Sequence, residues 1–258
     1  LPENNIVTIQ PDSLRILHNP LTGWVLYASM GVDAADFWAQ YDHMYIPELG
    51  HNVSVTDYAH TLYIRASWTD FNPQEDVYGW KIDSNLRAYI EGAYQRNMRL
   101  AFRVVVDSRD KRTEFTPQFV KDAGAKGFMN KGKWSPYSDD SVFQKYYTKF
   151  VKALAKDFND PSKVEFIDGF GLGKWGEYHT MIYSTGDDTP KKAVFDWVTD
   201  IYSQAFDKVP VVINYHRWIG AGKDWVDDEH FAADSEEMLE EAIKKGYSLR
   251  HDAFGMTT

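Results

Sequence analysis

Short apolar runs alternate along the chain with longer segments in which apolar residues recur every three or four positions. The short runs have the length and the β-branched or aromatic content of buried strands, and they lie at 24–28, 61–65, 99–106, 164–167, 209–214 and 247–254. The longer segments predict amphipathic helices at 34–44, 82–97, 141–158, 191–206 and 235–245. This alternation is typical of an α/β fold with parallel strands.

Three of the predicted helices carry recognisable faces or end signals. The segment 141–158 has a wide apolar stripe behind a cap at Asp140 or Ser141. We expect Ser235 to cap the last helix and Gly246 to stop it. The helix at 82–97 is expected to bury one face, formed by Ile82, Leu86, Tyr89, Ile90 and Ala93.

Six strand-and-helix units can be counted, and 258 residues is near the usual size of one (β/α)8 barrel. A closed barrel needs two more units, so the chain is either part of a longer protein or a smaller, open α/β sheet. Because an unclosed barrel would leave edge strands exposed, we favour the first interpretation. It predicts a single (β/α) barrel domain over 1–258, the N-terminal part of a longer protein whose remaining C-terminal segment would complete it.

The composition removes several classes of function. The net charge is −10 with dispersed acidic residues, which disfavours nucleic-acid binding because nucleic-acid binders carry a basic surface. No apolar run approaches the length of a membrane span, and the first residues show no charged-then-apolar signal pattern, so any secretion signal has been removed or never existed. Cysteine is absent, which excludes disulfides and thiolate metal sites.

The stretch from Val164 to Thr180 is the best candidate for a site. Its apolar run ends in Gly169, Gly171, Gly173 and Gly176, which permit sharp turns, and then in the carboxylate of Glu177. Active sites of α/β barrels lie at the C-terminal ends of their strands, so Glu177 is a candidate catalytic acid. The long, polar and Gly-rich segment 107–140 is expected to be a functional loop.

Several segments resemble β-galactosidase-like and related clan A glycoside hydrolases. The segment 62–80, LYIRASWTDFNPQEDVYGW, resembles their second-strand region, 99–106 their third strand, and 166–180 the end of their fourth strand. The segments 19–24 and 249–255 are similar to barrel proteins of gut and soil Bacteroidetes. The resemblance implies a TIM-barrel enzyme that takes part in carbohydrate metabolism and polysaccharide degradation, and that is secreted, periplasmic or on the cell surface.

The resemblance also implies roles for individual residues. It places the general acid/base of a retaining glycosidase at Glu177, although Gly176 stands where the clan usually has Asn. The nucleophile would come from a seventh strand, which lies outside this chain. The substrate would be a poly- or oligosaccharide, cleaved by two carboxyl groups about 5 to 5.5 Å apart. Desolvation by Trp175 and Tyr178 is expected to raise the pKa of Glu177, as an acid requires.

Other interpretations stay open beside this one. Glu177 can instead cap a loop or pair with an arginine. The barrel can be a non-catalytic carbohydrate-binding protein, or it can catalyse a different reaction, because a fold does not fix a function. No metal or cofactor is expected: the histidines lack metal-ligand spacing, and the Gly-rich run at 169–173 does not open a helix as a dinucleotide loop must.

Charged residues near the strand ends are candidates for substrate binding. Arg65 and Arg103 end adjacent apolar strands, so each should bind substrate or pair with a carboxylate such as Asp168. Arg250 and Asp252 share one face of the sixth strand, and Asp252 is the best second carboxylate within the chain.

Aromatic, amide and imidazole groups complete the set of substrate-binding candidates. Asn214 and His216 share a face at the end of the fifth strand, which suits recognition of sugar hydroxyls. Trp68, Trp175 and Trp218 can stack on sugar rings, with core packing as the alternative for each. Tyr178 and His179, which flank Glu177 in sequence, are also expected to contact substrate.

Overall fold

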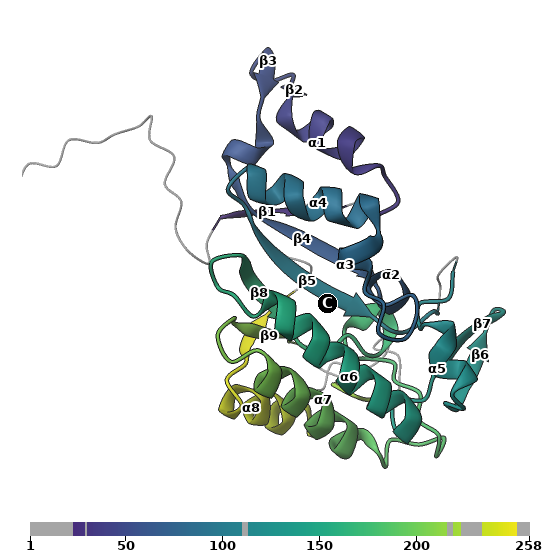
Figure 1. The fold of residues 1–258 in the computed structure, drawn as a ribbon. Coiled ribbons are helices and arrows are strands. Elements are labelled where there is room, and N and C mark those ends of the chain that lie inside the picture. Colours follow the sequence, from purple (N-terminus) through teal and green to yellow (C-terminus); the bar gives the residue numbers. More distant parts are fainter. Residues whose placement is uncertain (1–22, 29, 110–112, 216–218, 223–233, 252–258) are drawn as a thin grey trace, which may run out of the picture.

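The computed structural model describes residues 23–28, 30–109, 113–215, 219–222 and 234–251. These residues form a curled sheet of six parallel strands in chain order (Figure 1). The strands are β1 (Trp24–Tyr27), β4 (Ala59–Ser67), β5 (Arg99–Val105), β8 (Val164–Asp168), β9 (Val211–Asn214) and β10 (Ser248–Arg250). The strand order and parallel register are those of a partial (β/α)8 barrel, so the predicted fold class is confirmed.

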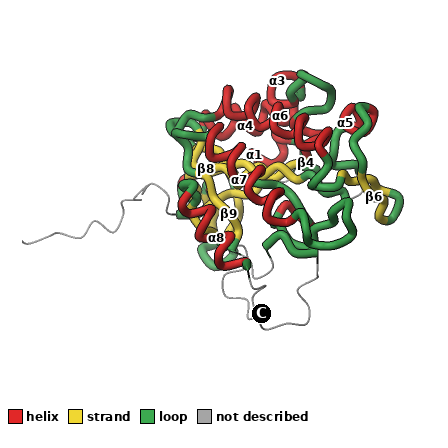
Figure 2. The backbone as a smooth tube through the Cα atoms, turned by 90° about the horizontal axis from the view of Figure 1, so that it is seen from below, coloured by secondary structure: helices red, strands yellow, loops and turns green. Residues whose placement is uncertain are grey.

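Helices follow the strands along the chain. They are α1 (Ala34–Asp42), α2 (Trp68–Phe71), α3 (Gly79–Ile82), α4 (Ser84–Gln95), α5 (Gln118–Asp122), α6 (Ser141–Phe158), α7 (Lys191–Ala205) and α8 (Ser235–Lys244). Figure 2 shows the same helices and strands from below. None of the helices in the described part of the chain is long and apolar enough to cross a membrane.

The two faces of the sheet have different chemistry because side chains alternate along a strand. Leu62, Ile64, Leu100 and Phe102 belong to the continuous apolar core that the helices cover, and the ring of Phe102 lies 4.8 Å from that of Phe158 on α6. The alternate positions carry Tyr63, Arg65, Arg103 and Asp168. Arg103 on β5 is in direct register with Arg65 on β4 and with Asp168 on β8. We call this second face the inner face.

The packing of α6 and α7 holds the chain just after β8. Asp140 caps α6 by accepting a hydrogen bond from the amide of Phe143 at 2.9 Å, as the sequence predicts. The buried hydroxyl of Tyr147 on α6 donates to the carbonyl oxygen of Phe170 at 3.0 Å and lies 2.8 Å from the hydroxyl of Tyr202 on α7. Burial raises the pKa of both phenols, so both stay neutral and able to donate.

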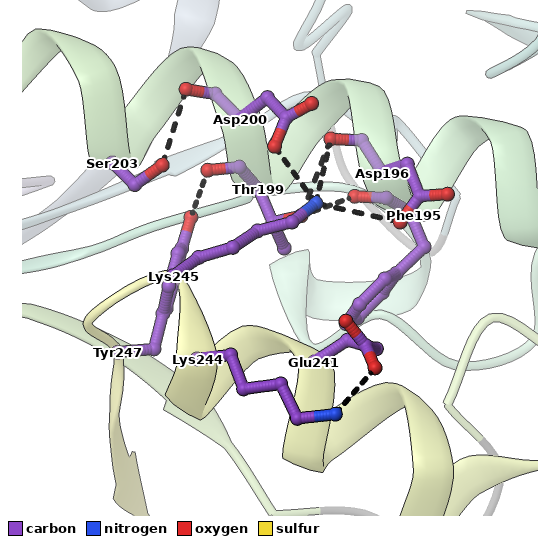
Figure 3. Close-up of polar contacts among 9 residues, drawn as sticks. All are labelled: Phe195, Asp196, Thr199, Asp200, Ser203, Glu241, Lys244, Lys245 and Tyr247. Carbon is purple, nitrogen blue, oxygen red and sulfur yellow. Dashed lines mark hydrogen bonds and ion pairs between the residues drawn. The ribbon is translucent and has the colours of Figure 1, made fainter.

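Lys245, directly after α8, ties that helix to α7 (Figure 3). Its ammonium group lies 2.8 Å from the carboxylate of Asp200 and 2.9 Å from the hydroxyl of Thr199. The nearby hydroxyl of Tyr247 donates to the carbonyl oxygen of Gly169 at 2.8 Å. A Cβ on Gly169 would lie 2.2 Å from Val211, so only glycine fits at the end of β8. Side chains from α6 and from the start of β10 thus bind the backbone that leads to Glu177.

Two expected helix features need correction. The helix predicted at 82–97 is split, because Asp83 ends α3 and caps α4 through the amide of Leu86 at 2.6 Å. Ile82 is therefore 60% exposed instead of buried. Ser235 does not cap α8, because its hydroxyl accepts from the amide of Ile219 at 3.1 Å. The predicted stop at Gly246 is confirmed, since this glycine has φ +93° directly after the helix.

The segment 107–140 contains regular structure that the sequence analysis did not predict. It holds α5 and a hairpin of β6 (Gly127–Asn130) and β7 (Lys133–Pro136). Lys131 and Gly132 connect the two strands with φ of 47° and 77°, the positive values that a two-residue hairpin turn requires. A second hairpin, β2 (Met44–Ile46) with β3 (His51–Val53), was likewise not predicted. These short strands do not form the apolar runs that identified the strands of the main sheet.

Candidate active site

The inner face brings charged side chains together at the C-terminal ends of β4, β5, β8 and β10. Arg103 is the centre of this group and only 1% exposed. Its Nε donates to Asp168 at 2.7 Å, and its Nη1 donates to Glu177 at 3.1 Å. The expected Arg103–Asp168 pair is therefore present, and the same guanidinium also binds the candidate acid.

Asp168 is enclosed by three polar side chains from three different strands, two of which donate hydrogen bonds to it. Its Oδ2 accepts from Tyr63 at 2.7 Å and from Arg103 at 2.7 Å, and it lies 2.9 Å from Nε of Arg250. The Tyr63 ring is near both guanidinium groups, whose Cζ atoms lie 5.9 and 5.8 Å from the ring centroid. A carboxylate this enclosed holds its neighbours in place.

Glu177 occupies a more open position at the same edge. Its side chain is 15% exposed, against 1% for Asp168. One carboxylate oxygen lies 3.1 Å from Arg103, and the other lies 3.5 Å from Nε2 of His179. The alternative in which Glu177 pairs with an arginine is thus realised, and the pairing keeps the carboxylate at the barrel edge where a reacting group would be needed.

The chain between β8 and Glu177 has an unusual backbone. Gly171, Gly173 and Gly176 all have positive φ, and so do the non-glycine residues Trp175 (59°) and Tyr178 (61°). A Cβ on Gly171 would lie 2.1 Å from the carbonyl oxygen of Val104, so the segment passes too close to β5 for any other residue. The glycines of the motif are therefore explained by close approach and by left-handed geometry.

Tyr178 is an anchor for this segment and not a substrate contact, which corrects the prediction. Its side chain is fully buried, and its ring packs 5.4 Å from Phe170 and 5.6 Å from Phe195. Burial raises the pKa of its phenol well above the usual range. The ring thus points into the core between the segment and α7, away from the desolvating position beside Glu177 that the sequence suggested.

His179 is also buried, at 1% exposure, but it faces the candidate acid. Its Nδ1 lies 2.8 Å from the hydroxyl of Thr180, and its ring meets that of Trp175 edge-on at 5.7 Å. Trp175 itself is partly exposed, with the Lys174 ammonium 4.6 Å from its ring centroid. Of these two predicted substrate contacts, Trp175 offers surface to a sugar, whereas His179 contacts Glu177.

The remaining predicted site residues lie in different environments. Trp68 is a core residue with no exposed surface, packed 5.1 Å from the ring of Tyr147, so the alternative of core packing holds. Asn214 is 3% exposed and too buried for the predicted recognition of hydroxyl groups. Arg250 retains 21% side-chain exposure while it holds Asp168. His216, Trp218 and Asp252 lie outside the described residues.

Arg65 is half-buried on β4, beside Arg103. Its Nη2 donates to the carbonyl oxygen of Trp175 at 2.7 Å. Arg65 therefore does not pair with Asp168 as expected. It binds the backbone of the segment that carries Glu177 instead.

Two features of the site were not predicted. Tyr63 contacts Asp168, and a signal was present, because it stands two positions before Arg65 and so shares its face. The second feature is a buried pair after β5, in which Nε of Arg109 binds Asp107 at 2.7 Å while Nη2 donates to the carbonyl oxygen of Thr180 at 2.5 Å. No pattern in the sequence indicates the contact between Arg109 and Thr180.

The described residues offer no metal cluster at this edge, and a small pocket lies beside it. No group of three His, Cys, Asp or Glu side chains among them has a metal-binding arrangement. A pocket of about 10 Å³ lies between Asp107, Phe128, Leu172 and Met181, room for about one water molecule. A sugar ring does not fit in this pocket.

No protein-family model matches the sequence, and no curated protein matches it. Among solved structures, the chain is similar to an endo-1,4-beta-xylanase from Caldicellulosiruptor owensensis, with a TM-score of 0.42, 14% identity and coverage of 74% of this chain and 51% of that one. It is also similar to endo-glycoceramidase II from Rhodococcus sp., with a TM-score of 0.47, 13% identity and coverage of 86% and 60%. A third is a GH10 structure from Paenibacillus barcinonensis, with a TM-score of 0.49, 12% identity and coverage of 88% and 58%.

These neighbours are glycoside hydrolases, and the chain spans about half to three fifths of their length. All three TM-scores are below 0.5, so the assignment of a partial (β/α)8 barrel rests on the strand order and the parallel register of the sheet.

Proposed function

We propose that this chain is part of a retaining glycoside hydrolase that acts on a poly- or oligosaccharide, with Glu177 as the general acid/base. The observation that carries the proposal is the position of the Glu177 carboxylate. It lies after the fourth parallel strand, at the C-terminal edge of the sheet, partly exposed and held by Arg103 and His179.

In this mechanism Glu177 first protonates the glycosidic oxygen and later takes a proton from the attacking water. Arg103 fixes the carboxylate, and Asp168 fixes Arg103 through the 2.7 Å contact. Trp175 supplies a partly exposed ring on which a sugar can stack.

Retention also needs a nucleophilic carboxylate about 5 to 5.5 Å from the acid. Asp168 is poorly suited to this role, because its Oδ2 is held by Tyr63, Arg103 and Arg250 and its side chain is 1% exposed. We therefore assign the nucleophile to a glutamate of the full-length protein outside this chain, and we propose that the same outside segment completes the barrel.

The test is hydrolysis by the full-length protein, measured as release of reducing ends from a panel of polysaccharides. Glu177→Gln should lower the rate by about 100- to 10,000-fold, the usual contribution of a general acid/base. Glu75→Gln is the matched control, because Glu75 is an exposed residue paired with Lys149. Unchanged hydrolysis by Glu177→Gln would show that the assignment is wrong.

A second candidate function is non-catalytic carbohydrate binding on the same surface. It is favoured by one observation. Of the two carboxylates bound to Arg103, Asp168 is buried and only Glu177 is partly exposed, so these two do not form a reactive pair. Isothermal titration with the same polysaccharide panel separates the candidates. Binding without any release of reducing ends by the full-length protein would favour the binding function.

The β-galactosidase-like subtype, the relationship to Bacteroidetes barrel proteins and a location outside the cytoplasm are further parts of this proposal. They are supported by the sequence resemblance alone. Fractionation of cells that express the full-length protein tests the location, and a protein confined to the cytoplasmic fraction would contradict it.

A further inference from the structure

The segment that carries Glu177 contains three non-glycine residues in the left-handed backbone region. Trp175, Tyr178 and Thr180 have φ of 59°, 61° and 51°. Each such residue is strained and persists only where the surrounding structure enforces it. Three of them within six positions therefore require specific restraints from outside the segment.

The carbonyl oxygens of these three residues all accept hydrogen bonds from elsewhere in the chain. Trp175 accepts from Arg65 at 2.7 Å, Tyr178 from the amide of Gly220 at 2.7 Å, and Thr180 from Arg109 at 2.5 Å. Two of the three donors are guanidinium groups, whose charge-assisted hydrogen bonds are stronger than those between neutral groups.

The two arginines are themselves held by the barrel. Arg65 is on β4 in register with Arg103, and Arg109 follows β5 and is fixed by the buried carboxylate of Asp107 at 2.7 Å. The arginines thus connect the second and third strands of the sheet to the loop of the fourth. Glu177 and His179 lie between the two restrained carbonyl groups.

We propose that Arg65 and Arg109 are positioning residues that hold the segment 175–180 in its left-handed conformation and so fix the Glu177 carboxylate. The catalytic consequence rests on the function proposed above, whereas the restraint of the backbone does not. This role replaces the contact with substrate that the sequence suggested for Arg65.

Hydrogen exchange followed by mass spectrometry tests the restraint directly. The amides of Gly176, Glu177, Tyr178 and Met181 are hydrogen-bonded, so a peptide covering 174–181 reports opening of the segment. In Arg65→Met this peptide should exchange about 10- to 100-fold faster, as expected for loss of a charge-assisted hydrogen bond, while the β5 peptide 99–105 is unchanged. Arg65→Lys, which keeps a donor, should restore part of the protection.

Arg109 is tested in the double variant Asp107→Asn/Arg109→Met, which avoids leaving Asp107 as a buried unpaired charge. It should increase exchange in the same peptide. Arg87→Met is the control, because Arg87 is exposed on α4 and pairs with Glu91. Faster exchange in every peptide of Arg65→Met and Arg65→Lys would indicate general destabilisation and would overturn the proposal.

Steady-state kinetics of the full-length protein, measured with a 4-nitrophenyl glycoside that it hydrolyses, distinguish a positioning role of Arg65 from a substrate-binding role. A positioning role predicts that Arg65→Met lowers kcat while KM stays within about twofold. A raised KM with unchanged exchange in 174–181 would make Arg65 a substrate contact and refute the proposal. If Glu177→Gln retains full activity while Arg65→Met exchanges faster, the restraint stands and the proposed function fails.

Discussion

Asp168 and Glu177 bind the same guanidinium group but lie in two different regions of the molecule. Asp168 ends β8 in direct register with Arg103, is 1% exposed and accepts from donors at 2.7 Å. Glu177 lies on the segment after β8, is 15% exposed and lies 3.1 Å from Arg103 and 3.5 Å from His179. Of the two carboxylates in this charge cluster, Asp168 is thus buried and fixed, whereas Glu177 is accessible to solvent.

The backbone explains this division. A parallel strand fixes its side chains by register, so Asp168 cannot move without breaking the sheet. The segment 175–180 instead holds left-handed residues, and strained backbone of this kind is concentrated at functional sites. The comparison indicates that the strand end stabilises the fold and that the following segment presents the carboxylate proposed as the general acid/base.

The largest effect on stability is expected at the enclosed carboxylate. Asp168→Asn leaves Arg103 buried without its full charge partner and should lower the free energy of unfolding by about 3–5 kcal/mol. Urea unfolding monitored by tryptophan fluorescence measures this. Glu177→Gln in parallel should cost about 1 kcal/mol or less, as expected of a weaker, partly exposed pair. Equal losses for the two variants would remove the distinction.

The next effect concerns the close approach of the loop to β5. Gly171→Ala should cost more than about 2 kcal/mol, because a Cβ would lie 2.1 Å from the Val104 carbonyl oxygen in addition to the left-handed strain. Gly186→Ala is the matched control, since Gly186 has φ +79° but open space around its Cβ position, and it should cost about 1–2 kcal/mol. Urea unfolding compares the two variants. Similar losses in the free energy of unfolding would mean that the loop does not depend on its close contact with β5.

A smaller effect is expected where Tyr63 supports Asp168. Tyr63→Phe removes the 2.7 Å hydrogen bond to Asp168 and keeps the ring, so the free energy of unfolding should fall by about 1.5–3 kcal/mol, the value for a hydrogen bond to a charged group. A double-mutant cycle with Asp168→Asn measures the coupling. A coupling near zero would show that Tyr63 does not hold Asp168.

The smallest effect lies far from the site, in the ion pair between Asp42 and Arg96. The hydrogen bond from Arg96 lowers the pKa of Asp42, so the pair stabilises the fold above about pH 4, where unfolded aspartate ionises, and this stabilisation is lost as pH falls through the lower folded-state pKa. Asp42→Asn should cost about 1 kcal/mol or less at pH 7, and nothing once the folded-state carboxyl is protonated. Unfolding measured between pH 3 and 7 checks this, and a cost independent of pH would contradict it.

The sequence predicted the sheet well because its strands are continuous apolar runs separated by amphipathic helices. Helix α6 was found with its bounds and its cap, since an apolar stripe and Asp140 are both local signals. The two hairpins were missed because their short strands do not form such apolar runs, and Ser235 was misassigned because a tertiary contact with Ile219 uses its hydroxyl.

Within the site, the sequence identified the residues better than their partners. Glu177, Arg103 and Asp168 were all found from their positions at strand ends. Burial of Trp68 and Tyr178 could not be predicted, because an aromatic residue near a strand end has the same local pattern in a cleft and in a core. The contact of Arg109 with Thr180 joins distant segments and depends on the fold alone.

The role of Glu177 is tested most directly by the dependence of kcat/KM on the leaving group, measured with a series of aryl glycosides and the full-length protein. A general acid protonates the departing oxygen, so substrates with poor leaving groups depend on it most. The account predicts a shallow dependence for the wild-type protein and a steep one for Glu177→Gln, with near-normal rates only for the best leaving groups. Parallel dependences for the two proteins would contradict it.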